Sequence, residues 1–188
     1  MKLNIVYEIV PSNFAEDLDK SHFATAGDYV LENATIKAQD VYQRVRKQST
    51  MPLLIIGSDT VVVNSEGTIL EKPASPKDAI ATLRGLSGKT NTVFTGVCLI
   101  VGAKDGSETV LIEKAVESTK VEFEDLDDSL IEAYVATGEP MDKAGSYAYQ
   151  SLACFFVKSI VGDFYNVVGF PCARFYQMLR SLHEKGLV

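Results

Sequence analysis

The feature that most constrains the fold is the apolar run at residues 53–56 (LLII), which leads through Gly57 and Ser58 to Asp59. Four consecutive apolar residues followed by a glycine are typical of a buried central strand. Ligands bind at the carboxyl ends of strands in open α/β sheets, so Asp59 is placed where a carboxylate can bind a metal or deprotonate a water. The alternative role is the cap of a turn, and position alone leaves the two open.

Strand and helix patterns alternate on both sides of this run and predict an α/β fold with a mixed sheet. Period-2 or fully apolar stretches predict strands at 3–10, 92–101, 109–123 and 152–160, and a hairpin at 61–70. Helical spacing predicts helices at 27–48, from Ser75 onwards, at 128–137 and at 172–184. No repeat or linker divides these elements, so we expect a single domain over residues 1–188.

Composition narrows the class of protein. With 46% hydrophobic residues the chain has an ordinary globular composition, and its net charge of −7 argues against a nucleic-acid polymer as partner. The three cysteines form no CxxC pair, so reduced thiols in a cytoplasmic protein are expected rather than a zinc site or disulfides. No apolar stretch is long enough for a membrane helix, and we expect no membrane partner.

Four charged segments are candidates for binding. Lys72 in the segment Glu-Lys-Pro could neutralise phosphate, although an exposed charge before a turn is the commoner fate of a lysine. The loop 138–145 (GEPMDKAG) and the turn at Gly162-Asp163 are either binding loops or solvated connections. The acidic residues at 16–19 become interesting only if the fold brings one of them to Asp59, which would make an all-oxygen site for magnesium or manganese.

A further segment, 85–90 (GLSGKT), ends like a phosphate-binding P-loop but is not one. The motif needs a glycine at position 83, where the chain has Leu83. A helix also precedes this segment and a strand follows it, which is the reverse of the P-loop order.

Taken in order, the segments resemble the Maf family of nucleoside triphosphate pyrophosphatases over nearly the whole chain. The matching pieces are PSNFAEDLD at 11–19, ATIKA at 34–38, GSDTVV at 57–62, ILEKP at 69–73, LSGKTNTVFTGV at 86–97, GEPMDKAGSYAYQ at 138–150 and GDFYNVVGFP at 162–171. The resemblance implies a two-lobed α/β fold with a central cleft, similar to the inosine triphosphate pyrophosphatases. It also implies attack of water on the α-phosphorus of a nucleoside triphosphate, giving the monophosphate and pyrophosphate.

The resemblance also assigns roles by position. Asp59 matches the catalytic acid, and Glu16 matches an acid of the metal and phosphate site, with Mg or Mn as the expected divalent metal. Three lysines match those that line the cleft: Lys37, Lys72 and Lys143. Thr60 and Gln150 match positions tied to base choice, and this pairing resembles the dTTP/UTP-type subgroup. The implied partner is the nucleoside triphosphate, and a homodimer is left open.

The start of the chain departs from the family pattern. Family members begin with a short strand and a loop containing two consecutive arginines, whereas this chain has Met1-Lys2-Leu3 shortly before the PSNF segment. We therefore expect a Maf-like domain that is incomplete at its N-terminus. The alternative to an active pyrophosphatase is a catalytically impaired nucleotide-binding or interaction module of the same fold.

Overall fold

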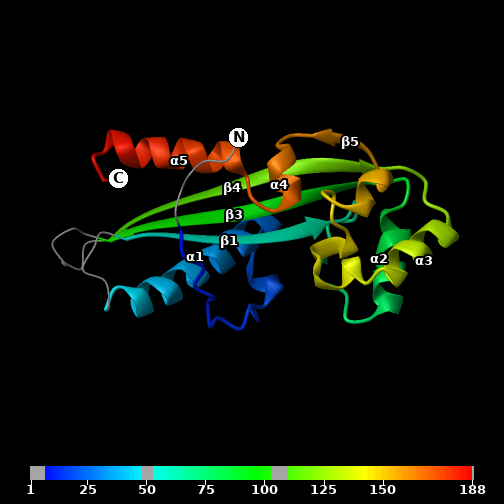
Figure 1. Cartoon of the computed structure of the whole chain (residues 1–188), viewed down its shortest axis with the longest axis horizontal. Helices are drawn as coiled ribbons and strands as arrows, with labels where there is room; N and C mark the ends of the chain where they lie inside the picture. Colours follow the sequence, from blue (N-terminus) through cyan, green and yellow to red (C-terminus); the bar gives the residue numbers. More distant parts are fainter. Residues whose placement is uncertain (1–6, 48–52, 103–109, 188) are drawn as a thin grey trace.

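The computed structural model describes residues 7–47, 53–102 and 110–187, which form one sheet with helices packed on it (Figure 1). The sheet has the strand order β2-β1-β3-β4-β5. Its strands are β1 (Leu54–Val63), β2 (Ile69–Leu70), β3 (Thr90–Gly102), β4 (Val110–Phe123) and β5 (Val157–Val161). The predicted α/β class is confirmed, and so is the hairpin that joins β1 to β2.

The expected mixed sheet is wrong for the strands that the structure describes, because all four neighbouring pairs are antiparallel. A parallel pair needs a crossover that returns the chain to the end where it started. Here each connection between neighbouring strands, including the one from β1 through β2 and α2 (Pro76–Leu86) to β3, reverses the direction of the chain.

Two strand predictions need correction. Of the strand expected at 3–10, residues 1–6 lie outside the described part of the chain, and 7–10 are in no strand, with Tyr7 and Ile9 largely exposed. The run 53–56 was expected in a buried central position. In fact β2 pairs only with Val62 and Val63, so within the described residues the first half of β1 lies at an open edge, and Ile56 is 43% exposed.

Long helices cover the two faces of the sheet. The helix α1 (Ala26–Val45) begins with a capping box in which Thr25 and Asp28 bond each other's backbone N–H groups. It packs on one face, and α5 (Cys172–Glu184) packs on the other (Figure 1). Because side chains alternate along a strand, β3 serves both faces: Cys98 and Ile100 join the α1 cluster, while Val97, Leu99 and Val101 join the α5 cluster.

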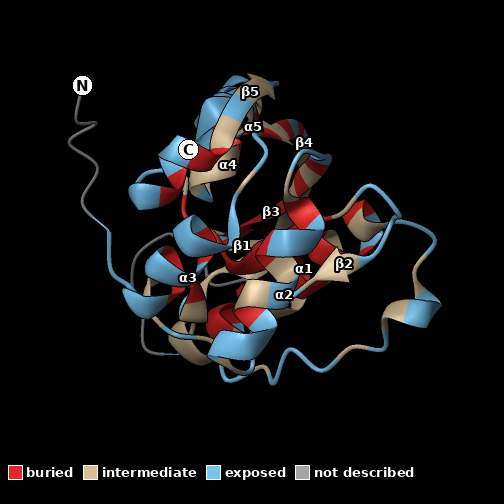
Figure 2. Cartoon of the chain, turned by 90° about the vertical axis from the view of Figure 1, so that its right-hand side faces the viewer, coloured by how far each residue is buried: buried red, intermediate tan, exposed pale blue. Residues whose placement is uncertain are grey.

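A second lobe forms at the far end of the strands, where α2 and α3 (Asp128–Ala136) pack together. Its core contains the edge-to-face ring pairs Phe123–Tyr147 and Tyr134–Phe156. The expected strand at 152–160 is only half right: Leu152–Phe156 forms a 3₁₀ helix before β5 begins. That helix buries Ala153 and Phe156 in this core. The two residues are three apart, so in a strand with period-2 alternation they would point to opposite faces. The buried residues gather around the sheet in both lobes (Figure 2).

Two glycines let α1 approach the sheet closely. A Cβ atom on Gly57 would lie 2.3 Å from the carbonyl oxygen of Ala34, and one on Gly96 would lie 2.5 Å from that of Val30. Real side chains are excluded at such distances, so the backbone of α1 rests directly on β1 and β3. This contact therefore sets the height above β1 of the next side chains of α1, such as Lys37, one turn after Ala34.

No helix in the described ranges has the length and apolar character to span a membrane.

We predict that Gly57→Ala lifts α1 from β1 and lowers stability by about 1–3 kcal/mol, the usual cost of overpacking. Gly85→Ala is the matched control, because a Cβ there meets nothing within 4 Å and α2 gains a better helix former. Thermal unfolding of the two variants beside the wild type measures the effect. Equal melting temperatures for Gly57→Ala and wild type would contradict this view of the α1 contact.

Candidate functional site

A cleft of about 650 Å³ lies between the two lobes, and all seven residues singled out in the sequence line it. They come from five separate parts of the chain, which the fold brings together. These residues are Glu16, Lys37, Asp59, Thr60, Lys72, Lys143 and Gln150. Asn33 and Tyr147, which the sequence reasoning did not select, line the same cleft.

Asp59 stands in the middle of β1, opposite Gly96 on β3, and not at the carboxyl end of a strand. The prediction of its position was wrong because the strand continues through Thr60 to Val63 instead of ending after Gly57. Its side chain still lines the cleft, because it lies on the face of β1 that meets Asn33 and Lys37 of α1. The alternative of a turn cap is thereby excluded.

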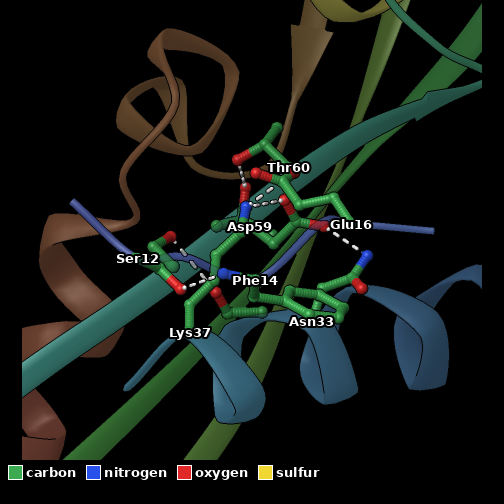
Figure 3. Close-up of polar contacts among 10 residues, drawn as sticks. Ser12, Phe14, Glu16, Asn33, Lys37, Asp59 and Thr60 are labelled. Atoms are coloured by element: carbon green, nitrogen blue, oxygen red, sulfur yellow. Dashed lines mark hydrogen bonds and ion pairs between the residues drawn. The ribbon is translucent and has the colours of Figure 1, made fainter. Parts of the chain in front are cut away.

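Two further charged groups and one amide gather around this carboxylate (Figure 3). Lys37 Nζ lies 2.8 Å from Asp59 Oδ1 and 2.9 Å from Glu16 Oε2, so one ammonium bridges two carboxylates. Asn33, one helical turn before Lys37, donates from Nδ2 to Asp59 Oδ2 over 2.9 Å. Burial opposes the charge on Lys37, but the hydrogen bonds to Asp59 and Glu16 raise its pKa above the usual value. The ammonium therefore stays charged, and the trio carries a net negative charge when both carboxylates are ionised.

Glu16 reaches this cluster from an extended segment that lies across α1. Its backbone has φ +55°, a left-handed conformation that a non-glycine residue adopts at some cost. The segment is tied down by Asp40, which accepts hydrogen bonds from the Asn13 backbone N–H (2.9 Å) and the Ser12 hydroxyl (3.3 Å). These contacts, the Asn13 N–H foremost, lower the pKa of Asp40, and Arg44 at 3.0 Å adds to the effect. Asp40 thus holds the segment from which Glu16 extends.

The other two lysines line the cleft from the segment after β2 and from the loop after α3. Lys72 is exposed and follows β2, next to Glu71, whose carboxylate pairs with Lys20 at 2.5 Å. The carbonyl of Glu71 accepts from the N–H of Gly145, which joins this segment to the loop carrying Lys143. Lys143 itself lies 2.7 Å from the exposed carboxylate of Asp142. Both ammonium groups can therefore face an anion in the cleft.

A hydroxyl pair and an anchored loop make up a third part of the site. The hydroxyls of Thr60 and the fully buried Thr95 lie 2.9 Å apart. Gln150 is exposed on the segment after Tyr147, whose hydroxyl donates to Asn91 Oδ1 over 3.0 Å. Such contacts fix the loop while leaving the Gln150 amide available.

Glu139 ties the same loop to α3. It accepts from the Tyr134 hydroxyl at 2.8 Å and from the Ser151 hydroxyl at 2.6 Å, and Tyr134 in turn accepts from the Ala148 N–H. Burial, together with Glu139, raises the pKa of Tyr134, so its hydroxyl remains a donor. The 138–145 segment is thus a binding-loop candidate with a defined anchor.

The turn at Gly162-Asp163 is structural. Asp163 caps the short helix α4 (Phe164–Val168) by accepting from the Tyr165 N–H at 2.8 Å, and neither Gly162 nor Asp163 lines the cleft. The simple strand-to-helix turn is therefore the correct interpretation of this segment.

The donor set at Asp59 fits a hard divalent cation that substrate helps to hold. In the described ranges no three His, Cys, Asp or Glu side chains are grouped so that they could enclose a metal. Magnesium, however, is commonly bound by one or two carboxylates together with substrate phosphates and water. Glu16 and Asp59, both within 2.9 Å of one Lys37 nitrogen, provide two such carboxylates in a single place.

Comparison with known protein families agrees with this architecture. Residues 1–182 match the family described as Maf-like protein. The chain belongs to that family. This Maf-like chain is 40% identical over 181 residues to a dTTP/UTP pyrophosphatase of Caldicellulosiruptor bescii, with 96% of this chain and 86% of that protein covered. It is 44% identical over 164 residues to a nucleoside triphosphate pyrophosphatase of Dictyostelium discoideum, covering 87% and 75%.

A human relative is longer. The Maf-like chain is 44% identical over 179 residues to a probable bifunctional dTTP/UTP pyrophosphatase/methyltransferase protein of Homo sapiens. The match covers 94% of this chain but only 29% of the human protein.

Removal of the Asp40 anchor should loosen the segment that carries Glu16. We expect Asp40→Ala to make the amide hydrogens of Asn13 and Phe14 exchange about tenfold faster. The Asn13 N–H loses its acceptor, and the Ser12 hydroxyl, which accepts from the Phe14 N–H, loses the bond that holds it. Asp17→Ala is the control, because Asp17 is an exposed acid of the same segment. Hydrogen exchange followed by NMR provides the measurement, and unchanged rates at Asn13 and Phe14 would refute the anchoring role.

Proposed function

We propose that the chain is a nucleoside triphosphate pyrophosphatase that hydrolyses dTTP, UTP and modified pyrimidine nucleotides to the monophosphate and pyrophosphate. The observation that carries the proposal is the convergence of Asp59, Glu16 and Lys37 in one cleft, which two further lysines also line. The names of the relatives in bacteria and Dictyostelium support the same activity. Phosphoryl transfer depends chiefly on positioning and charge neutralisation, which such a cleft supplies.

In this proposal Glu16 and Asp59 would hold a divalent metal, Mg or Mn, together with the phosphates. Such a metal would neutralise charge on the phosphate oxygens and polarise the phosphoryl group. Lys72 and Lys143 face the remaining phosphate oxygens as point charges. Lys37 keeps the two carboxylates in place, because its ammonium is already shared between them.

Asp59 is the proposed general base. Its carboxylate accepts a proton from the water whose oxygen forms the new bond to the α-phosphorus. The bond that breaks joins the α-phosphorus to the bridging oxygen, and pyrophosphate leaves with the electron pair. The side chain of Asp59 is only 11% exposed, which limits competition from bulk water around the reacting oxygen.

Base selection is assigned to Thr60 and Gln150. A glutamine amide donates from its nitrogen and accepts at its oxygen, so it can pair with both groups on the edge of a pyrimidine. The Thr60–Thr95 hydroxyl pair adds a second polar contact deeper in the fold, because Thr95 is fully buried. These groups suit thymine or uracil better than guanine, whose edge carries a different pattern of hydrogen-bond donors and acceptors.

The activity is tested by pyrophosphate release from UTP in the presence of magnesium or manganese. We expect the wild type to turn over and Asp59→Asn to be slower by about 100-fold or more, the usual loss of a general base. Asp128→Asn is the control, since that carboxylate lies outside the cleft and pairs with Arg84. UTP binding without pyrophosphate release by the wild type would favour the non-catalytic module instead.

Substrate choice is tested by comparing kcat/KM for UTP and dTTP with that for GTP and 7-methyl-GTP. We expect the pyrimidine nucleotides to be preferred, and Gln150→Ala to reduce kcat/KM for UTP by about tenfold or more as polar groups lose their partner. Gln177→Ala, an exposed glutamine on α5, should leave kcat/KM unchanged. Equal or better hydrolysis of 7-methyl-GTP would overturn the assignment.

A further inference from the structure

Asn33 is a buried polar residue at the centre of the site that neither the sequence nor the family resemblance selected. Only 1% of it is exposed, yet it lines the cleft. Its Nδ2 donates to Asp59 Oδ2 over 2.9 Å, while Lys37 Nζ lies 2.8 Å from Oδ1 of the same carboxylate (Figure 3). Both oxygens of Asp59 therefore have a donor on α1, from residues one helical turn apart.

The other end of the Asn33 amide is unsatisfied. Its Oδ1 is buried and has no hydrogen-bond partner among the described residues. A buried acceptor without a partner destabilises a fold, so this asparagine is a poor choice for stability alone. Local conflicts of this kind are expected where a residue is retained for function.

The two donors together fix the orientation of the Asp59 carboxylate, which neither fixes alone. A carboxylate rotates readily about its last bond, and one lysine at the end of a flexible chain does not define the plane of the carboxylate. A second donor on the other oxygen defines that plane, and the remaining lone pairs are left for other partners. Because Gly57 and Gly96 seat α1 directly on the sheet, the height of Asn33 above β1 is set by backbone contact.

We infer that Asn33 is a positioning residue, which aligns the Asp59 carboxylate for proton transfer by donating to Oδ2. The inference rests on the proposed pyrophosphatase activity and adds to it a residue that acts through Asp59. Residues that orient a functional group in this way commonly contribute about 10- to 100-fold to activity. Since Asn33 acts on the reacting group, its effect belongs to kcat rather than to KM.

Asn33→Leu tests the inference, because leucine has the same branched shape but no donor and no unsatisfied oxygen. We expect kcat for UTP with saturating magnesium to fall about tenfold or more, while KM changes by less than about threefold. The melting temperature should change by no more than about 4 °C, because the lost bond is offset by removal of the unpaired oxygen. Thr35→Val is the control on the same helix: Thr35 is equally buried, but its hydroxyl bonds to the Leu31 carbonyl, and kcat should stay at the wild-type value.

Several outcomes would overturn the inference. A kcat for Asn33→Leu within twofold of the wild type shows that Asp59 needs no second donor, and a rise in KM at constant kcat shows a substrate contact instead. Should Asn33→Leu fail to fold, Asn33→Ala is judged by the same criteria, because it removes the amide without adding bulk. An inactive wild type overturns the proposed function and this inference together, whereas an active wild type with an unaffected Asn33→Leu overturns the inference alone.

Discussion

The seating of α1 on the sheet is the contact on which the site depends. Because Gly57 and Gly96 carry no side chain, the helix backbone lies against β1 and β3, and Lys37 meets Asp59 at 2.8 Å. A wider helix-to-sheet spacing would leave Asp59 as a largely buried carboxylate without a counter-charge, which is costly. The close packing of α1 on the sheet therefore also determines the electrostatics of the cleft.

The second lobe contributes a different kind of wall. Its core of edge-to-face rings is apolar, and the polar residues at its rim are carried on 3₁₀ turns and a loop that Glu139 ties to Tyr134 and Ser151. Loops on a rigid core are where binding residues usually lie. Strand β1 of one lobe therefore carries Asp59, and the segment before α1 carries Glu16, while the loops of the other lobe present Lys143 and Gln150.

Sequence patterns predicted most of the elements because helix caps, turn glycines and periodicity are local. Ser75 as N-cap and the hairpin before Ile69 are examples of such local signals. Pairing direction is not local, so the mixed sheet and the end of the strand near Asp59 were misjudged. Asn33 was missed for the same reason: its spacing of four from Lys37 is visible in the sequence, but its meaning depends on which face of α1 meets β1.

The charge pattern of the cleft separates the roles of its three lysines. Lys37 contacts two carboxylates within 2.9 Å. The positive charge of Lys37 is therefore already balanced when a phosphate enters the cleft. Lys72 is exposed, and Lys143 faces the solvated carboxylate of Asp142, a weak competitor for a polyanion. The resemblance grouped the three as equivalent cleft lysines. Their surroundings instead make Lys37 a structural counter-charge for Asp59 and Glu16, and leave Lys72 and Lys143 as the cations available to a phosphate chain.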